Sequence, residues 1–406
     1  MRSTAMSHLR RHSARGAAAM LAAALSAGLL PAGPAEAGRH CPNLRVPGAE
    51  YQVVACLDEL TTAGTVASGH TNPADYAGLT HAGLPQQSGV PGVQIDGYFP
   101  DTSTTNRNHG WNHDSQYVIR LPEKWNGGLV VAGSPGVRAQ YANDRAISDW
   151  VLAKGYAFAA TDKGNTGANF FTDGVKPGDA IVEWNQRTTQ LTRAARAVVA
   201  QYYGRAPREV VAAGISNGGY LVRWQLENHP ELYTRGVDLE GTLWTAEGPN
   251  LLNFLPPAIR GYEQQSPGQI VAAGFDPRSD FLWDYHYTVY WKLTQRIYAA
   301  ELDPTYTGTE ADYDYASRPA AQQAVRRIAL TGRIGRPLTT FHGTLDSLLP
   351  ITQDSDVYAE LVRRAGRSRL FTYQRIEAGN HVDGLVDAHP DRLVPLVPLL
   401  QQAITR

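Results

Sequence analysis

The chain has 406 residues, of which 43% are apolar and 18% charged, a balance that provides a sizeable core and excludes a disordered chain. With a formal net charge of −1, the chain lacks the excess of basic residues that binding to nucleic acid or to an anionic membrane requires. The sequence shows no internal repeat of about 20 to 50 residues, which excludes solenoids and propellers.

Residues 1–37 have the pattern of a secretory signal peptide. Four arginines precede or border an apolar run over residues 17–30, which is shorter than the about 20 residues that a membrane-spanning helix needs. Ala35 and Ala37 then supply the small residues of a cleavage site. The segment predicts a secreted, extracellular protein without membrane contact after cleavage. A retained anchor is the alternative, and the Arg10-Arg11 pair leaves both the general and the twin-arginine export routes open.

The N-terminal segment, residues 38–90, is rich in loop-forming residues and predicts no clear element. It contains the only two cysteines of the chain, Cys41 and Cys56. An even number of cysteines in an exported protein predicts a disulfide, here one that would pin the N-terminus of the mature chain. Two buried thiols are the alternative, whereas two isolated cysteines match neither a zinc site nor a redox CxxC motif.

From residue 91 onward, short apolar runs alternate with segments of helical spacing. Strands are predicted over residues 93–98, 116–121, 128–132, 156–161, 209–214 and 236–244. Helices are predicted over residues 141–154, 181–203 and 217–228. Strands separated by helices indicate parallel βαβ units, and therefore one mostly parallel central sheet with helices on both faces. Residues 91–246 form the first part of this α/β core.

The alternation stops over residues 247–335, where aromatic side chains are concentrated, and it resumes over residues 336–406. This second part of the core is predicted to contain strands over residues 338–341 and 369–376 and helices over residues 355–365 and 392–404. An insertion flanked by core strands indicates a lid. Its aromatic residues suit either internal packing or a pocket wall for acyl, aryl or sugar groups.

The motif Gly214-Ile215-Ser216-Asn217-Gly218 lies between a predicted strand and a predicted helix. In that context G-x-S-x-G predicts a nucleophile elbow, in which the serine occupies a strained turn and the two glycines let neighbouring backbone pass closely. The Ser216 hydroxyl would then stand at the carboxyl edge of the sheet, beside a helix N-terminus that favours developing negative charge. A plain Gly/Ser turn is the alternative.

A serine nucleophile needs a base and an orienting carboxylate, which in this architecture follow in the order Ser, acid, His. Asp346, in the turn after a predicted strand, is the predicted acid, and His381, in the loop after the last strand, is the predicted base. The alternatives are Asp354 and Asp356 for the acid and His389 for the base, while His342 is interpreted as a turn residue. Asp383 is close enough in sequence to tune His381, but we interpret it as a solvated loop carboxylate.

The oxyanion hole needs two backbone N–H groups directed at the tetrahedral intermediate. One is predicted from Asn217, directly after the nucleophile. The second is expected from the loop after the first buried strand, where Pro135 has no N–H to donate. Ser134 is the preferred donor, and Gly136 and Val137 are the alternatives.

Two other motifs in the chain are weaker candidates for a functional site. His109 and His113 have the spacing of a metal-binding pair on a helix, but the intervening Asn and Gly residues favour a loop. Residues 161–167 are glycine-rich without the spacing of a phosphate-binding P-loop, and they are expected either to line the pocket or to form a simple turn. We therefore predict neither a metal nor an organic cofactor.

The motifs around Ser216, Asp346 and His381 resemble those of an α/β-hydrolase, and the likeness runs from Val93 to the C-terminus. Segments similar to the secreted 3-hydroxybutyrate oligomer hydrolases, and more distantly to tannase and feruloyl esterases, lie at residues 148–150, 155–157, 161–164 and 215–219. The resemblance implies the α/β-hydrolase fold and an extracellular carboxylic-ester hydrolase in which Ser216, Asp346 and His381 form the catalytic triad.

The sequence thus predicts a secreted serine esterase that acts through an acyl-enzyme on a small or oligomeric ester, such as a hydroxyalkanoate oligomer or an aryl ester. An extracellular peptidase on the same fold is the first alternative, because ester and amide hydrolysis share the triad. In that case Glu183, Glu240 or Glu247 would hold a substrate amine. A non-catalytic binding protein on a hydrolase scaffold is the second alternative. We expect no nucleic-acid partner, and the oligomeric state stays open.

Overall fold

The computed structural model describes residues 41–406, so the predicted signal peptide at residues 1–37 lies outside the described residues. Within the described part, the strands are β1 (Tyr51–Leu57), β2 (Gly92–Tyr98), β3 (Gln116–Pro122), β4 (Gly128–Gly133), β5 (Ala157–Thr161), β6 (Glu209–Ile215), β7 (Arg235–Leu239), β8 (Leu338–Gly343) and β9 (Phe371–Ile376). The α-helices of the same part are α1 (Thr62–Thr65), α2 (Pro73–Tyr76), α3 (Asp149–Ala153), α4 (Asp179–Tyr203), α5 (Asn217–Asn228), α6 (Leu251–Glu263), α7 (Pro267–Ala272), α8 (Asp280–His286), α9 (Lys292–Leu302), α10 (Pro319–Arg326), α11 (Ser355–Arg364) and α12 (Val397–Ile404). Two π-helical turns, Asp144–Ser148 and Tyr287–Trp291, directly precede α3 and α9.

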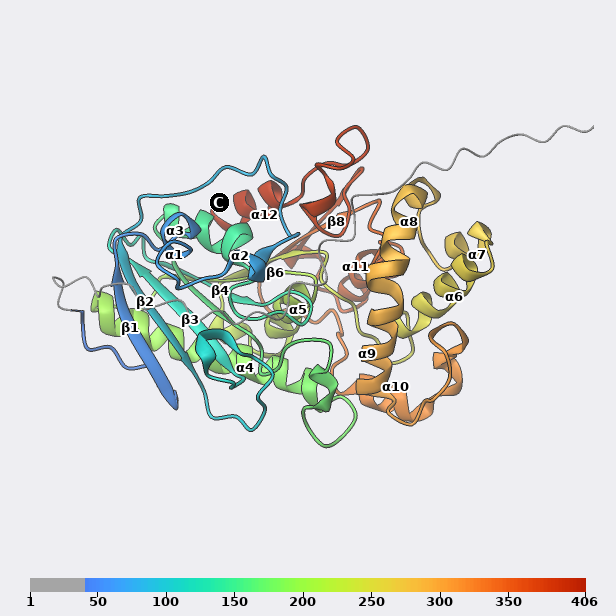
Figure 1. Cartoon of the computed structure of the whole chain (residues 1–406), viewed down its shortest axis with the longest axis horizontal. Coiled ribbons are helices and arrows are strands. Elements are labelled where there is room, and N and C mark those ends of the chain that lie inside the picture. Colours follow the sequence, from blue (N-terminus) through green and yellow to red (C-terminus); the bar gives the residue numbers. More distant parts are fainter. Residues whose placement is uncertain (1–40) are drawn as a thin grey trace, which may run out of the picture. The chain divides into compact units, whose positions relative to one another are not determined.

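The strands of the described part form one sheet in the order β1-β2-β3-β5-β4-β6-β7-β8-β9 (Figure 1). The pairs β1–β2, β2–β3 and β3–β5 are antiparallel, while β5, β4, β6, β7, β8 and β9 run parallel. Parallel neighbours need crossover connections, which α3, α4, α5, α11 and the long segment between β7 and β8 provide. The predicted mostly parallel sheet is therefore confirmed, and the carboxyl ends of its parallel strands share one edge.

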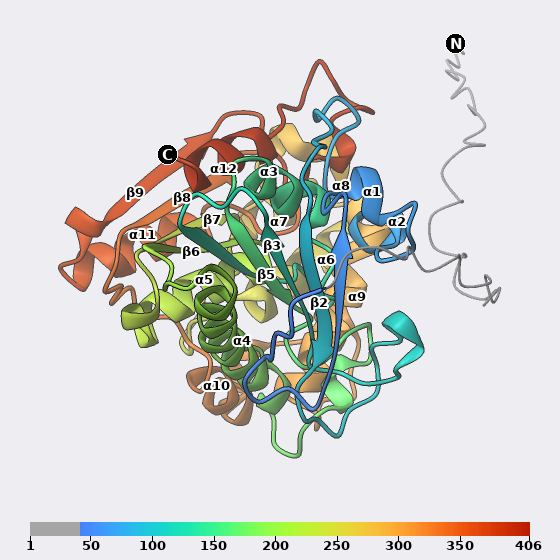
Figure 2. The same ribbon diagram turned by 90° about the vertical axis from the view of Figure 1, so that its left-hand side faces the viewer.

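The central strands are buried on both faces, as their continuous apolar runs require. In β4, Leu129 and Val131 join the hydrophobic cluster that contains the inner faces of α4 and α5. Val130 and Ala132 join the cluster on the opposite face, with residues of α3 and α12. Figure 2 shows α4 and α5 on one side of the sheet and α3 and α12 on the other. Because such interiors are close-packed, the ends of the strands are held in fixed positions.

Several elements differ from the sequence prediction. The helix predicted over residues 141–154 consists of the π-helical turn Asp144–Ser148 and the short α3, and the N-terminal segment contains α1 and α2. β1 is an edge strand within the N-terminal segment, for which the sequence predicts no element. The strand predicted over residues 236–244 ends at Leu239, because Glu240 has a φ of 53° and leaves the extended conformation. The closing helix predicted over residues 392–404 begins at Val397, because a helix that started earlier would place Pro395 where it has no N–H to donate and where its ring crowds the preceding turn.

The predicted disulfide joins Cys41 to Cys56, whose Cα atoms are 5.7 Å apart. It ties residue 41 to β1 and so to the edge of the sheet. Among the described helices, none combines the length and the apolar character of a membrane span.

Between β7 and β8 the chain leaves the sheet and forms the helical insertion, α6 to α10. These helices lie together at one end of the sheet, at the right in Figure 1. Trp291, in the π-helical turn before α9, donates a hydrogen bond from its indole nitrogen to the Ser347 carbonyl oxygen at 2.7 Å. Ser347 directly follows the predicted acid Asp346, so the insertion is attached to the loop that positions this residue.

Candidate active site

Ser216 lies at the sharp turn between β6 and α5. Its φ of 57° and ψ of −122° are strained for a residue with a side chain. A Cβ on Gly214 would lie 2.2 Å from the Gly218 carbonyl oxygen, and one on Gly218 would lie 2.6 Å from the Gly133 carbonyl oxygen. Only glycine fits at both positions, so the motif permits the tight turn that presents the Ser216 hydroxyl.

His381 and Asp346 approach Ser216 from the loops that follow β9 and β8. His381 Nε2 lies 3.0 Å from Ser216 Oγ, and His381 Nδ1 lies 2.8 Å from Asp346 Oδ2. The structure thus brings together the three residues predicted for the triad, in the order hydroxyl, imidazole, carboxylate that removal of the serine proton requires. His381 and Asp346 are buried and Ser216 is half-buried, which shields these bonds from water.

Asp346 is surrounded by donors that favour its charged form. Its Oδ1 accepts hydrogen bonds from the backbone N–H groups of Leu348 and Leu349, each at 2.8 Å. Its Oδ2 contacts His381 and also lies 3.1 Å from His342 Nε2. Burial alone would raise the pKa of Asp346, but the charges and hydrogen bonds of His381 and His342 lower it well below the usual range. An ionised Asp346 is an acceptor for a hydrogen bond from His381 Nδ1–H, so the contact favours the tautomer that carries its proton on Nδ1.

The N–H groups considered for an oxyanion hole lie at the start of α5 and in the loop after β4. Asn217 is the first residue of α5, so its N–H has no acceptor within that helix. The N–H of Ser134 instead donates to the Thr161 carbonyl oxygen at 3.2 Å and continues the pairing of β4 with β5. Ser134 is therefore not free to supply the second donor as predicted, and the alternatives Gly136 and Val137 stay as predictions.

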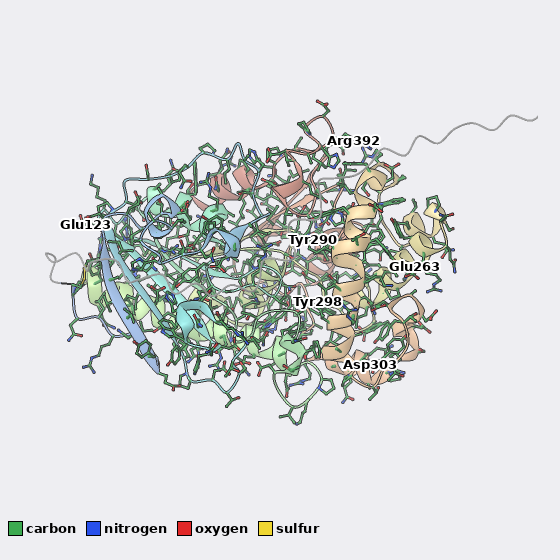
Figure 3. The ribbon with its side chains drawn as sticks, viewed as in Figure 1. Glu123, Glu263, Tyr290, Tyr298, Asp303 and Arg392 are labelled. Carbon is green, nitrogen blue, oxygen red and sulfur yellow. A yellow bond between two sulfur atoms is a disulfide. The ribbon has the colours of Figure 1, made fainter. Side chains whose placement is uncertain are left out.

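The Asn217 side chain joins three segments around Ser216. Its Nδ2 donates to the Gly136 carbonyl oxygen at 3.0 Å and to the Tyr298 hydroxyl at 2.6 Å. Its Oδ1 accepts a hydrogen bond from the Thr242 hydroxyl at 3.0 Å. Figure 3 labels Tyr298 and Tyr290 beside the long helical segment that ends in α9, both on its side nearer the sheet. The insertion is thus bonded to the residue directly after Ser216.

The alternatives considered for the triad have other contacts. His389 packs edge-on against the Phe281 ring, with the ring centroids 4.8 Å apart. Asp354 is ion-paired with Arg223 at 3.0 Å inside the core, and Asp356 lies on α11. The structure therefore places His381 and Asp346, and not these residues, in the line that begins at Ser216.

Asp383 is buried, contrary to its interpretation as a solvated loop carboxylate. It accepts hydrogen bonds from the backbone N–H groups of Leu396 at 2.6 Å and Val397 at 3.0 Å, where α12 begins. Burial raises the pKa of Asp383 to about 6, although these two hydrogen bonds and His81 lower it in part. Its partners lie more than a dozen residues away, so no local sequence pattern marks this role.

Of the three glutamates considered for holding a substrate amine, two are engaged elsewhere and the third is buried beside His381. Glu183 pairs with Arg187 at 2.7 Å, and Glu247 is exposed and belongs to a surface ion pair. Glu240 is fully buried on the Nδ1 side of the His381 ring, with its Oε2 3.7 Å from that nitrogen. These contacts do not favour the peptidase alternative.

Lys163, in the glycine-rich loop of residues 161–167, is a part of the site that sequence reasoning misses. It is fully buried, and its Nζ donates to the Ser134 hydroxyl at 2.5 Å. That hydroxyl in turn donates to the Arg138 carbonyl oxygen at 2.6 Å. Burial lowers the pKa of Lys163 to about 7, although the neighbouring Asp162 raises it in part. The loop therefore supports the segment after β4 instead of forming a simple turn.

His109 and His113 lie in an irregular loop and stack on different rings. The His109 ring stacks on Trp111 with centroids 4.4 Å apart, and the His113 ring stacks on Tyr98 at 3.8 Å. These contacts favour packing of the two rings over a shared metal ion.

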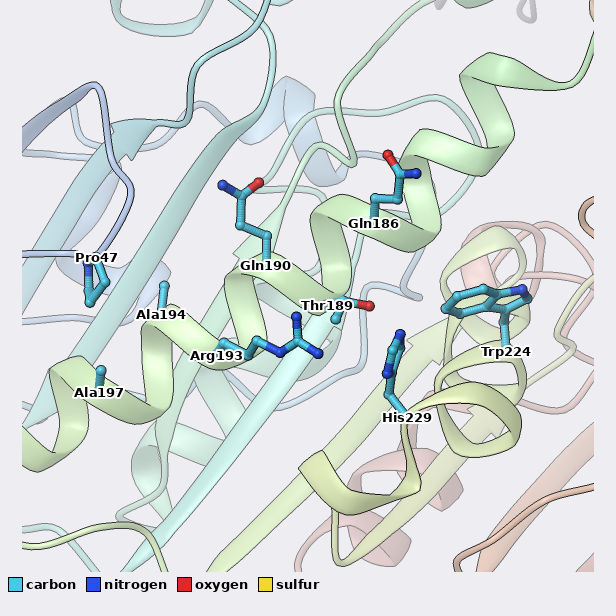
Figure 4. Close-up of a pocket in the computed structure, with 9 residues that line it drawn as sticks. All are labelled: Pro47, Gln186, Thr189, Gln190, Arg193, Ala194, Ala197, Trp224 and His229. Carbon is cyan, nitrogen blue, oxygen red and sulfur yellow. The ribbon is translucent and has the colours of Figure 1, made fainter.

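The hollow drawn in Figure 4 lies along α4 and has a volume of about 420 Å³. Its lining residues are Pro47, Gln186, Thr189, Gln190, Arg193, Ala194, Ala197, Trp224 and His229. It belongs to the helical layer on one face of the sheet and contains none of the three triad residues, so we assign it no part in the chemistry.

A family model described as tannase and feruloyl esterase matches residues 103–234 of the chain. The matched region includes Ser216 and ends before Asp346 and His381. No curated protein matches the sequence closely enough to count as a relative. The expected resemblance to 3-hydroxybutyrate oligomer hydrolases is not shown by these comparisons.

Solved structures share the fold. Feruloyl esterase B from Aspergillus oryzae superposes with a TM-score of 0.55 at 12% sequence identity, covering 83% of this chain and 81% of that chain. An esterase from Aspergillus oryzae superposes with a TM-score of 0.52 at 11% identity, covering 84% and 81%. At these identities the likeness concerns the fold alone, and it confirms the predicted α/β-hydrolase fold. The sequence match to an ester-cleaving family, on this fold, identifies the chain as a carboxylic-ester hydrolase.

Proposed function

We propose that this carboxylic-ester hydrolase is a secreted serine esterase that works through Ser216, His381 and Asp346. The observation behind the proposal is the pair of hydrogen-bond distances at His381, 3.0 Å to Ser216 Oγ and 2.8 Å to Asp346 Oδ2. A serine hydroxyl is a weak nucleophile alone, and an imidazole at this distance is the base that activates it.

In the first half-reaction, Ser216 Oγ attacks the ester carbonyl while His381 Nε2 takes its proton. Asp346 stabilises the imidazolium that forms. The N–H of Asn217, with one N–H from residues 136–137, stabilises the negative charge on the carbonyl oxygen. His381 then gives its proton to the leaving alcohol, and the acyl group stays on Ser216.

In the second half-reaction, His381 deprotonates a water molecule, which attacks the acyl carbon. The acid product leaves and the Ser216 hydroxyl is restored. All of these steps use side chains, backbone N–H groups and water, so the proposal includes neither a metal nor an organic cofactor.

We place the substrate between the sheet edge and the helical insertion, which we interpret as a lid over residues 247–335. The hydrogen bond from Asn217 to Tyr298 fixes the insertion beside the nucleophile, and Tyr290 lies on the same side of that helical segment (Figure 3). Aromatic side chains stack well on aryl groups. Together with the match to the tannase and feruloyl esterase model, this favours a feruloyl or galloyl ester over a hydroxyalkanoate oligomer.

The proposal is tested with the purified secreted protein on methyl ferulate, methyl gallate, short p-nitrophenyl esters, hydroxybutyrate oligomers and aminoacyl p-nitroanilides. We expect turnover of the aryl esters by the wild-type protein and no turnover by Ser216→Ala. Ser368→Ala is the control with unchanged turnover, because it removes an exposed hydroxyl in the turn before β9. Preferential cleavage of the anilides would support the peptidase alternative. No turnover of any substrate by the folded wild-type protein would support the binding-protein alternative.

A further inference from the structure

Glu240 places a second carboxyl group next to the triad. It follows β7, and its backbone N–H donates to the Phe341 carbonyl oxygen at 2.9 Å. Its Oε1 accepts a hydrogen bond from the Gly343 N–H at 2.8 Å. Two bonds to β8 therefore fix the residue, and its φ of 53° is one that residues with side chains seldom adopt. Such a conformation persists only where the surroundings enforce it.

The other oxygen of Glu240 has no hydrogen-bond partner. Oε2 is buried and lies 3.7 Å from His381 Nδ1, the nitrogen that Asp346 Oδ2 contacts at 2.8 Å. Nδ1 has a single proton to donate, and the nearer carboxylate, Asp346, accepts that hydrogen bond. A distance of 3.7 Å is too long for a hydrogen bond, but a small movement of the Glu240 side chain would close it.

The charge state of Glu240 follows from this arrangement. Burial and the negative charge of Asp346 raise its pKa well above the usual range, only partly offset by the bond from Gly343. One ligand atom each of Glu240, His342 and Asp346 lie within 4.8 Å of one another. A cation among them would compete for the oxygen that holds His381, so a proton on Glu240 is the simpler way to neutralise the cluster.

We propose that Glu240 is a positioning residue of the triad, a reserve carboxyl that accepts the Nδ1–H bond of His381 when Asp346 does not. This inference rests on the proposed function. In the wild-type protein Asp346 holds the imidazole and Glu240 stays neutral beside it. When the Asp346 carboxylate is removed, its repulsion of a charged Glu240 is removed as well. Glu240 then releases its proton to water, and its carboxylate orients the ring.

The test compares Asp346→Ala, Asp346→Asn, Glu240→Gln and the double variant D346A/E240Q in ester hydrolysis. Removing the acid of such a triad typically costs about 10⁴-fold in kcat. We expect D346A, which leaves space for Glu240, to lose no more than about 10²-fold, and D346A/E240Q to lose about 10⁴-fold. E240Q alone should lose less than about tenfold, because Asp346 still holds the ring.

Asp346→Asn provides a more specific test. It is a more conservative substitution than Asp346→Ala, yet we expect it to lose more activity. The N–H groups of Leu348 and Leu349 would hold the amide oxygen of the new side chain, so its NH₂ group would face His381 Nδ1. His381 Nδ1 then has to accept a hydrogen bond, so the ring carries its proton on Nε2. In this tautomer Nδ1 has no proton to donate to Glu240. We expect D346N to resemble D346A/E240Q.

Two readouts separate positioning from a merely structural effect. The downfield proton NMR signal of the His381 Nδ1–H should persist in D346A and disappear in D346A/E240Q. The kcat/KM of D346A should rise with pH as Glu240 ionises, a step that D346A/E240Q lacks. D346A/E301Q, which changes a buried glutamate of α9 instead, should match D346A in both. If D346A does not fold, Asp346→Ser takes its place, because its hydroxyl can still accept a backbone N–H.

Equal activity of D346A and D346A/E240Q, with no downfield signal in either, would overturn the assignment of Glu240. The proposed function itself fails on a different result, namely activity in Ser216→Ala. If Ser216→Ala is inactive and D346A does not differ from D346A/E240Q, only the inference about Glu240 is refuted.

Discussion

The Asn217 side-chain amide donates a hydrogen bond to the Tyr298 hydroxyl over 2.6 Å, and this bond joins the turn at Ser216 to the helical insertion. The same amide group reaches the carbonyl oxygen of Gly136, in the loop after β4. One side chain thus connects the turn at Ser216, a segment considered for the oxyanion hole, and α9. A displacement of α9 would therefore reach the proposed reaction centre through Asn217.

Tyr298→Phe should weaken this connection while keeping the ring in place. Removing one hydrogen bond in the interior typically costs about 1 kcal/mol of stability. We expect kcat/KM for an aryl ester to fall several-fold, with a smaller effect on p-nitrophenyl acetate, which needs little of the insertion. Tyr306→Phe removes a different hydrogen bond of the insertion, to the Thr309 carbonyl oxygen, and serves as the control. Equal effects of the two variants on aryl esters would contradict a special role of Tyr298.

Lys163→Met should loosen the loop after β4, because Ser134 loses the hydrogen bond from Lys163 Nζ, which lies 2.5 Å from its hydroxyl. If this loop supplies an oxyanion donor, kcat should fall by about tenfold or more with KM changed little, since a donor of this kind is worth about 3 kcal/mol or more. Lys154→Met is the matched control, because Lys154 is exposed and lies over the Trp150 ring. Steady-state kinetics on one ester measures the effect. A wild-type kcat in Lys163→Met would show that Lys163 does not support an oxyanion donor in the loop after β4.

Gly218→Ala should damage catalysis more than stability. The added methyl group would meet the Gly133 carbonyl oxygen at 2.6 Å, and backbone at the end of β4 has to shift to admit it. We expect kcat to fall by about 100-fold, as misplacement of the reacting groups by about an ångström commonly does. Gly268→Ala on α7 adds the same methyl group in open space and should leave kcat unchanged. Full activity of Gly218→Ala would show that the turn at Ser216 tolerates a wider geometry than the structure indicates.

Asp383→Asn should change how stability depends on pH. Burial raises the pKa of Asp383 to about 6 in the folded protein, against an ordinary value of 3.8. Between these values the folded state binds more protons than the unfolded state, so this group's contribution is present below about pH 4 and is lost as the pH rises through 6. The loss amounts to about 3 kcal/mol.

Urea denaturation at pH 4, 5, 6 and 7 measures this effect. Asparagine does not titrate, so the stability of Asp383→Asn relative to the wild type should improve steadily from pH 4 to pH 7. A constant difference between the two proteins across this range would show that Asp383 titrates normally.

The sequence was sufficient to predict the mostly parallel core and to single out Ser216, Asp346 and His381, which the structure places within hydrogen-bond distance of one another, because their signals are local. A glycine two residues before and two after Ser216, and a strand before each of Asp346 and His381, are visible without any knowledge of the fold. The supporting residues have no such signal. Glu240 meets His381, and Lys163 meets Ser134, only after the chain has folded, since these pairs lie far apart in the sequence.

The prediction of Ser134 as an oxyanion donor rests on local sequence alone, and the tertiary structure contradicts it. Pro135 is excluded as a donor from sequence alone, since it has no N–H. The sequence does not show, however, that β4 and β5 continue to pair beyond Gly133. That pairing uses the Ser134 N–H, which donates to Thr161. The availability of a backbone donor depends on its partner strand, and the partner is a property of the fold.

The most direct test of the account is labelling of the purified protein with a fluorophosphonate, followed by peptide mass spectrometry. The reagent phosphonylates a serine only where a base has activated it. We expect one adduct in the wild-type protein, on the peptide that contains Ser216, and no adduct in His381→Ala. An adduct on another serine, or equal labelling of Ser216 with and without His381, would contradict it.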